Sequence, residues 1–315
     1  MKAQTGTRDK RTANRAARPA RRAAGRRPAD VEFTNVDKVM FPESGYTKGD
    51  LLKFYLQIAP YLLPQLRDRP ITIERLPDGV REGAPRFWQK NTPPYYPAWI
   101  PRVNLPAEQG KPVNYALVND ERALAYLVNQ GTVTFHVWFS RVPDIDRPDF
   151  VVFDLDPSGA PFTDVVQIAR TLHKLLDDAK VESYPKTSGK SGVHILVPWR
   201  QPGGYDGARA WAMNIAEQAV AELPDIATVE RSKAARGGRV YVDVMQNARG
   251  HHAVPAYVVR TTPLATVSTP LEWREVNARL DPRRFTMDAV LKRVAKKGDL
   301  LPNFASKAPA RKKRR

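Results

Sequence analysis

The stretch "VVFDLDPSG", residues 151–159, places an apolar run directly before two carboxylates and a turn sequence. Side chains alternate along a strand, so Asp154 and Asp156 should project from the same face, about 6–7 Å apart. Two like charges this close are unfavourable without a positive partner, and a divalent cation would supply one. The alternative is that residues 156–159 form only a turn. A turn explains Asp156 and leaves Asp154 unexplained.

A second strand carries another carboxylate. In "RVYVDVMQN", residues 239–247, Val240, Val242 and Val244 should share one face, and Tyr241 and Asp243 the other. A carboxylate on a largely apolar strand is costly unless it is paired or bound to a metal ion. We therefore expect Asp243 to join the two carboxylates of the first strand.

An anion-binding loop is predicted between these two strands. In "KTSGKSGVHILVP", residues 186–198, a loop of Ser, Gly and Lys precedes an apolar strand that begins near His194. Such a loop can turn backbone N–H groups toward an anion, although it does not match the P-loop pattern. Helices are expected at 162–180 and 206–222. Three carboxylates beside an anion loop suit two-metal phosphoryl transfer.

The segment before residue 70 predicts a capped helix and a lysine pair. Thr47 and Asp50 form a capping-box pattern at the start of an amphipathic helix over 47–63, with Pro60 as a kink or end. Lys38 and Lys48 lie on either side of the loop that precedes it. Two such lysines are either solvated or form an anion site near the helix N-terminus.

Aromatic residues and a histidine mark two further segments. The proline-rich residues 85–101 include Phe87 and Trp88, which indicate either a small satellite core or a surface for stacking bases. Residues 132–139, "TVTFHVWF", alternate strictly, so His136 lies opposite the apolar row. A single histidine on a strand is more often structural than functional.

The charge of the chain is concentrated at its ends. The net charge is +18, of which residues 1–29 carry +9 and residues 307–315 carry +6. We expect a disordered basic arm over 1–29, a nearly neutral catalytic domain over 30–306 and a basic tail over 307–315. Cysteine is absent, which excludes disulfides and a thiol nucleophile. No apolar run is long enough for a membrane span, and we expect a cytoplasmic, nucleoid-associated protein.

The motifs taken together resemble the polymerase domain of bacterial ligase D, a branch of the archaeo-eukaryotic primase superfamily. The resemblance covers roughly residues 31–300 and rests on the order of "TNVDKVMFPESGYTKGDLLKFY", "RPITIERLPDGV", "FWQKNTP", "HVWFSR", "PDFVVFDLDP", "KTSGKSGVHILVP", "VYVDVMQN" and "STPLEW". It implies an α+β fold, a primase-like core whose mixed β-sheets bear the catalytic carboxylates, with flanking helices. It also implies a primase-polymerase that fills short 5′-phosphorylated DNA gaps with NTPs or dNTPs.

The resemblance assigns roles to individual positions. The metal-binding, catalytic carboxylates are Asp154, Asp156 and Asp243, which would hold Mn²⁺ or Mg²⁺. Nucleotide contacts fall on His136, Ser188, Gly189, His194 and Arg260. Lys38 and Lys48 match a pair that holds a DNA 5′-phosphate, and Phe87 and Trp88 fall near aromatics that stack on template bases.

The sequence also departs from the family pattern. Lys190 is displaced by one position in the anion loop, and Gln246 stands where a basic residue is common. His251 and His252 are unusual, and we expect adjacent histidines on a strand to face opposite ways. We expect a stand-alone member that relies on a separate DNA ligase and an end-binding repair protein. The alternatives are a metal-dependent nuclease or phosphodiesterase, and a non-catalytic basic protein that binds nucleic acid.

Overall fold

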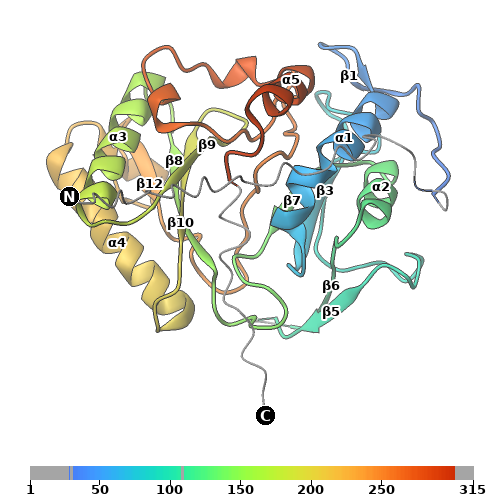
Figure 1. Cartoon of the computed structure of the whole chain (residues 1–315), viewed down its shortest axis with the longest axis horizontal. Helices are drawn as coiled ribbons and strands as arrows, with labels where there is room; N and C mark the ends of the chain where they lie inside the picture. The colour runs from blue at the N-terminus through green and yellow to red at the C-terminus, as the bar shows by residue number, and fades with distance from the viewer. Residues whose placement is uncertain (1–27, 29–30, 108–109, 302–315) are drawn as a thin grey trace, which may run out of the picture.

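The computed structural model describes residue 28, residues 31–107 and residues 110–301. The chain forms two halves, each built of a small sheet with helices on its outer face (Figure 1). The expected basic arm over 1–29 and tail over 307–315 lie outside the described residues, apart from residue 28. Among the described helices, none has the length and apolar character needed to cross a membrane.

The carboxylate strands belong to a mixed five-stranded sheet. Its strands, in spatial order, are β11 (Ala227–Thr228), β12 (Val240–Asp243), β8 (Phe150–Asp156), β10 (Val193–Pro198) and β9 (Tyr184–Thr187). Only the β11–β12 pair within this sheet is parallel. The α+β prediction with mixed sheets is confirmed.

One face of this sheet is buried under two helices. These are α3 (Phe162–Asp178) and α4 (Gly204–Glu222), on the left of Figure 1. Alternate side chains of β8 and β12, including Phe153, Leu155 and Val242, pack with them into one core. The period-two pattern of these strands therefore sends the intervening residues, the carboxylates among them, to the opposite face.

The other half contains a three-stranded antiparallel sheet in the order β4 (Phe87–Gln89), β3 (Ile71–Arg75) and β7 (Thr132–Val137). Apolar side chains of β3 and β7 pack with α1 (Lys48–Leu66) and α2 (Glu121–Asn129). The predicted alternation of β7 is confirmed, with Phe135 in this core and His136 on the other face. The same core includes Val152 and Leu196, so the two halves pack directly on each other.

Helix α1 is longer than the sequence suggested. It begins at the predicted capping box, where Thr47 and Asp50 exchange hydrogen bonds, but it continues through Pro60 and Pro64 to Leu66. Each proline removes a backbone donor and normally disfavours a helix interior. Of the two outcomes expected at Pro60, a kink or an end, the end is wrong, because the buried apolar face of α1 outweighs this cost.

The remaining elements border the two sheets. Two hairpins are formed by β1 (Val39–Phe41) with β2 (Tyr46–Thr47), and by β5 (Arg102–Leu105) with β6 (Val113–Ala116). Short 3₁₀ turns occur at η1 (Lys233–Ala235), η2 (Trp273–Glu275) and η3 (Pro282–Arg284), and α5 (Met287–Lys297) follows. Residues 253–270 join the halves, since Ala253 bridges to β7 and Pro270 to β9.

Candidate active site

A row of polar residues crosses four adjacent strands. The strand register places Asp243 of β12 opposite Asp154 of β8, Asp154 opposite His194 of β10, and His194 opposite Lys186 of β9. This face of the sheet points toward the other half of the molecule. Residues that lie up to 89 positions apart in the sequence are therefore aligned in one line.

Three members of this row form a hydrogen-bonded chain. Nζ of Lys186 lies 2.9 Å from Nδ1 of His194, and Nε2 of His194 lies 3.2 Å from Oδ1 of Asp154. Lys186 is buried and also donates to Oγ of Ser268 at 2.7 Å. Burial and the charge of Arg260 lower the pKa of Lys186 to about 7. An ionised carboxylate can only accept, so the His194 proton belongs on Nε2, and Nδ1 accepts from Lys186.

The hydrogen-bonded side chains of His194 and Lys186 keep the carboxyl group of Asp154 ionised. Burial alone would raise its pKa, but the imidazole of His194 and the more distant Lys186 lower it below the usual value. The pKa of His194 is in turn lowered, because burial outweighs the attraction of Asp154. At neutral pH the pair therefore consists of a carboxylate and a neutral imidazole that donates to it.

Asp156 takes part in a turn and also contacts a buried arginine. Its Oδ1 accepts a hydrogen bond from the backbone N–H of Ser158, as an Asp-initiated turn requires. Its Oδ2 lies 3.4 Å from Nη1 of Arg236, which is itself buried and stacks on the ring of Tyr241. Asp156 is thus a turn former and also a charged group facing the site.

Asp243 is held by three donors. Its Oδ1 accepts from the backbone of Met245 at 2.8 Å and from the hydroxyl of Tyr241 at 3.2 Å, and its Oδ2 accepts from the amide of Gln246 at 3.2 Å. Burial and the negative charge of Asp154 nevertheless raise its pKa. The sequence pattern predicted repulsion between Asp154 and Asp156, whereas the raised pKa of Asp243 reflects repulsion between Asp154 and Asp243.

The anion loop is organised around the Ser188 side chain. Oγ of Ser188 accepts from the backbone N–H groups of Lys190 and Gly192 at 3.1 and 3.0 Å. These two N–H groups are therefore used within the loop rather than turned outward, which differs from the expectation. Gly189 has φ +73°, and an added Cβ would lie 2.5 Å from Cγ of Arg260, so only glycine fits there.

Arg260 bridges the loop and the opposite sheet. Its Nη1 donates to the carbonyl of Ser188 at 2.5 Å. Burial lowers its pKa, and the carboxylate of Glu74, fully buried on β3, opposes that effect. Glu74 also pairs with Arg86. Together with Lys190, these side chains give this wall of the site an excess of positive charge.

The wall formed by the three-stranded sheet is aromatic. The ring of His136 lies 4.8 Å from that of Trp88 and 5.1 Å from that of His252, measured between centroids. Burial lowers the pKa of His136 well below its ordinary value. His251 is exposed and His252 is partly buried, and neither lies in the strand that the expectation had assumed.

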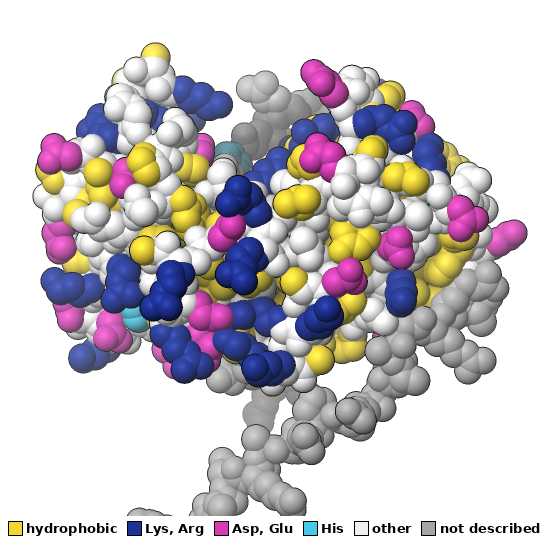
Figure 2. Space-filling view, turned by 90° about the horizontal axis from the view of Figure 1, so that it is seen from above, with side chains coloured by type: hydrophobic (Ala, Val, Ile, Leu, Met, Phe, Trp, Pro, Cys, Tyr) yellow, Lys and Arg dark blue, Asp and Glu magenta, His cyan; other side chains and the backbone are white. Residues whose placement is uncertain are grey.

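These walls enclose one pocket of about 400 Å³. All the predicted catalytic and nucleotide-binding residues except Gly189 line this pocket: His136, Asp154, Asp156, Ser188, His194, Asp243 and Arg260. On the face of the molecule seen from above Figure 1, Lys and Arg side chains lie along the middle, between the two halves (Figure 2). Gly189 lies directly behind Arg260.

The remaining predicted residues lie away from this pocket. Lys38 pairs with Asp78 at 2.9 Å, and Nζ of the buried Lys48 donates to the carbonyl of Thr34 at 2.6 Å. The charge of Lys38 contributes, after burial, to a lowered pKa of Lys48, so the two ammonium groups are near each other. Phe87 and Trp88 are adjacent on β4 and point to opposite faces, and both are half exposed.

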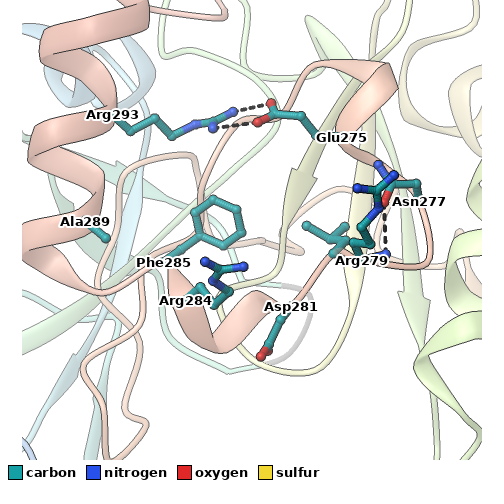
Figure 3. A pocket seen from close by; sticks show the side chains of 9 residues that line it. Glu275, Asn277, Arg279, Asp281, Arg284, Phe285, Ala289 and Arg293 are labelled. Atoms are coloured by element: carbon teal, nitrogen blue, oxygen red, sulfur yellow. Dashed lines mark hydrogen bonds and ion pairs between the residues drawn. The ribbon is translucent and has the colours of Figure 1, made fainter.

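A second pocket, of about 380 Å³, lies between η3 and α5 (Figure 3). Arg293 and Glu275 form an ion pair across it, and Arg284 stands near Asp281. None of the predicted site residues lines it.

Comparison with known proteins gives the family. The model described as "LigD, primase-polymerase domain" matches residues 47–301, most of the chain. The chain belongs to this family. It is a family of DNA-directed nucleotidyltransferases, and the predicted resemblance is confirmed.

Relatives and a solved structure agree. The chain is 34% identical over 282 residues to the multifunctional non-homologous end joining protein LigD of Mycolicibacterium smegmatis, covering 89% of this chain and 36% of that protein. It is 34% identical over 270 residues to the bifunctional LigD of Bacillus subtilis, covering 85% and 43%. The polymerase domain of Mycobacterium tuberculosis ligase D in complex with DNA matches with TM-score 0.82 and 30% identity, over 89% and 99% of the two chains. The chain thus spans under half the length of these curated relatives.

Sequence reasoning missed three residues of the site. Lys186 opens the quoted loop motif but carries no sequence sign of burial, and Arg236 lies in a stretch of several basic residues, "RSKAARGGR", residues 231–239. Glu74 lies in a family motif, "RPITIERLPDGV". An acidic side chain directly after Ile73 in a strand was the available signal, since buried acids are rare without a partner.

Proposed function

We propose that this chain is a template-dependent nucleotidyltransferase that fills short 5′-phosphorylated gaps in DNA, inserts ribonucleotides readily, and acts at the nucleoid during end joining. The main observation that supports this proposal is the row of four side chains that faces a pocket whose other wall is cationic: Asp243, Asp154, His194 and Lys186. The names of the relatives support end joining as the setting. We further propose a separate DNA ligase and an end-binding repair protein as partners.

The carboxylates fit divalent cations by their chemistry. Asp154, Asp156 and Asp243 would hold Mn²⁺ or Mg²⁺, since both prefer carboxylate oxygens. Such ions would stabilise charge on the transferring phosphoryl group and acidify the primer hydroxyl. Among the described residues no group of three acids or histidines is already gathered as a metal site. Each carboxylate is instead held by a protein donor, and the raised pKa of Asp243 marks a repulsion that a cation would remove.

Protein side chains would place the nucleotide. Arg260, Lys190 and the hydroxyl of Ser188 form the cationic wall of the pocket and would hold the triphosphate, with His194 oriented beside it. Gly189 allows Arg260 to approach the loop closely. Positioning and fixed charge would account for most of the rate, as in other phosphoryl transfers.

Outside the pocket, other residues would hold the DNA. Lys38 and Lys48 would take the 5′-phosphate on the far side of the gap, in competition with Asp78 for Lys38. Trp88, whose ring lies 4.8 Å from that of His136, would stack on a template base. Phe87 points to the other face of β4 and would stack on a different base.

The proposal is tested on a gapped duplex with a 5′-phosphate, each of the four template bases in turn, and Mn²⁺ or Mg²⁺. We expect extension by the complementary nucleotide only. Shortening of the primer without nucleotides would indicate a nuclease instead. Absence of templated extension with either metal contradicts the proposal.

A further inference from the structure

Two imidazole nitrogens in the pocket lack partners. Nε2 of His136 and Nδ1 of His252 are buried and have no hydrogen-bond partner among the described residues. Both side chains line the pocket of the carboxylates. Buried polar atoms are nearly always hydrogen-bonded in a folded protein. Two unsatisfied atoms on one pocket wall therefore point to a ligand that satisfies them.

The orientation of the His252 ring is fixed by its neighbours. It stacks on Trp88 with an interplanar angle of 24° and a centroid distance of 6.4 Å, and it meets the edge of the His136 ring at 5.1 Å. Burial and the charge of Lys90 lower the pKa of His252 to about 4. At neutral pH its ring is uncharged and offers one donor and one acceptor.

The layout of the pocket limits what reaches this wall. The carboxylates and the cationic wall attract the phosphates of a nucleotide and their bound cations, which leaves the nucleoside for the imidazole wall. A templated site must accept four bases, whose pairing edges face the template strand. A fixed polar group in such a site is therefore best matched to the sugar, which does not change with the identity of the base.

We propose that His252, beside His136, hydrogen-bonds the sugar hydroxyls of the incoming nucleotide and sets discrimination between ribo- and deoxyribonucleotides. This inference rests on the proposed function. A site that hydrogen-bonds a substrate hydroxyl disfavours the analogue that lacks it, because the protein group is then left unpaired.

The test compares His252→Phe with the wild type in single insertion of ATP and of dATP opposite thymine. Phenylalanine keeps a ring for Trp88 and removes both nitrogens. We expect the ratio of kcat/KM for ATP over dATP to fall about 10-fold, the typical effect of one lost hydrogen bond. The ratio is taken on one protein, so a smaller folded fraction does not change it. His251→Phe, an exposed neighbour, is the matched control and should keep the wild-type ratio.

An equal loss with both nucleotides would assign His252 to packing alone, and an unchanged ratio would remove it from the sugar site; either result overturns the inference. If the wild type extends no primer, the proposed function itself fails. Calorimetric titration of wild type and His252→Phe with ATP and dATP in Mn²⁺ then decides the inference separately. A ratio of dissociation constants that the variant leaves unchanged refutes it.

Discussion

Lys186→Met removes a buried ammonium group from the middle of the polar row while preserving an unbranched side chain of similar length. The variant deletes the 2.9 Å contact to Nδ1 of His194 and the 2.7 Å hydrogen bond to Ser268. His194 then loses the donor that fixes its tautomer and ring orientation. Its Nε2 is free to become an acceptor, which would repel the carboxylate of Asp154 rather than hold it.

The expected cost falls on catalysis more than on stability. Leaving one buried nitrogen unsatisfied costs about 1–3 kcal/mol, but removing a buried charge that is already hard to maintain offsets part of it. Loss of a group that orients an active-site histidine typically costs about 10–100-fold in activity. We therefore expect kcat/KM for gap filling to fall by that factor, with a melting temperature within a few degrees of wild type.

The assay is single-nucleotide insertion on a gapped duplex, with thermal melting of the same preparations. Ser268→Ala is the matched control, because it removes the other partner of Lys186 and leaves the contact to His194. It should retain activity within about three-fold, since that contact persists. Wild-type kcat/KM in folded Lys186→Met would refute the positioning role of the lysine.

The pKa of Lys186 gives a second measurement of the same variant. It is about 7 in the folded chain and 10.5 ordinarily, so between these values the unfolded chain binds more protons and folding becomes more favourable as pH rises. The slope is at most about 1.4 kcal/mol per pH unit. Lys186→Met should lack this rise in metal-free denaturation experiments. Parallel pH profiles for the two proteins would contradict the lowered pKa.

Three further outcomes are expected. Asp149→Ala should lower the free energy of unfolding by about 3–5 kcal/mol in urea, because buried Arg69 loses both carboxylate contacts of 2.6 and 2.7 Å; a loss under 1 kcal/mol argues against this. Lys38→Ala should slow extension across a 5′-phosphorylated gap and not a 5′-hydroxyl gap, and equal slowing would remove Lys38 from the phosphate site. Tyr241→Phe should raise the Mn²⁺ concentration for half-maximal extension by up to about 10-fold, since Asp243 loses a donor; an unchanged Mn²⁺ requirement would contradict that.

The sequence predicted the parts of the site that follow from strand periodicity. The spacing of Asp154 and Asp156 and the alternation around Asp243 indicate which face each side chain takes, and the register then aligns them. Lys186 and Arg236 could not be found this way, because their burial depends on partners about 80 residues away, Ser268 and Asp156. Local pattern carries no information about such long-range pairing.

The length of α1 was missed for a related reason. Pro60 is unfavourable by local propensity, and the packing that overrides it comes from distant segments. The anion loop differs for a local reason, since the Ser188 hydroxyl takes up the backbone N–H groups of Lys190 and Gly192, which the sequence suggested would point outward. Composition predicts an anion-binding loop but does not indicate which of its N–H groups remain available.

The central claim, templated nucleotide addition at the carboxylate row, is tested most directly by Asp154→Asn on a 5′-phosphorylated gapped duplex with Mn²⁺. Asp206→Asn is the matched control, since this acid is exposed on α4 and pairs only with Arg209 among the described residues. We predict templated extension by wild type and by Asp206→Asn. In Asp154→Asn we predict at least a 100-fold loss in the rate of extension (roughly 3 kcal/mol). Extension by Asp154→Asn at the wild-type rate would contradict it.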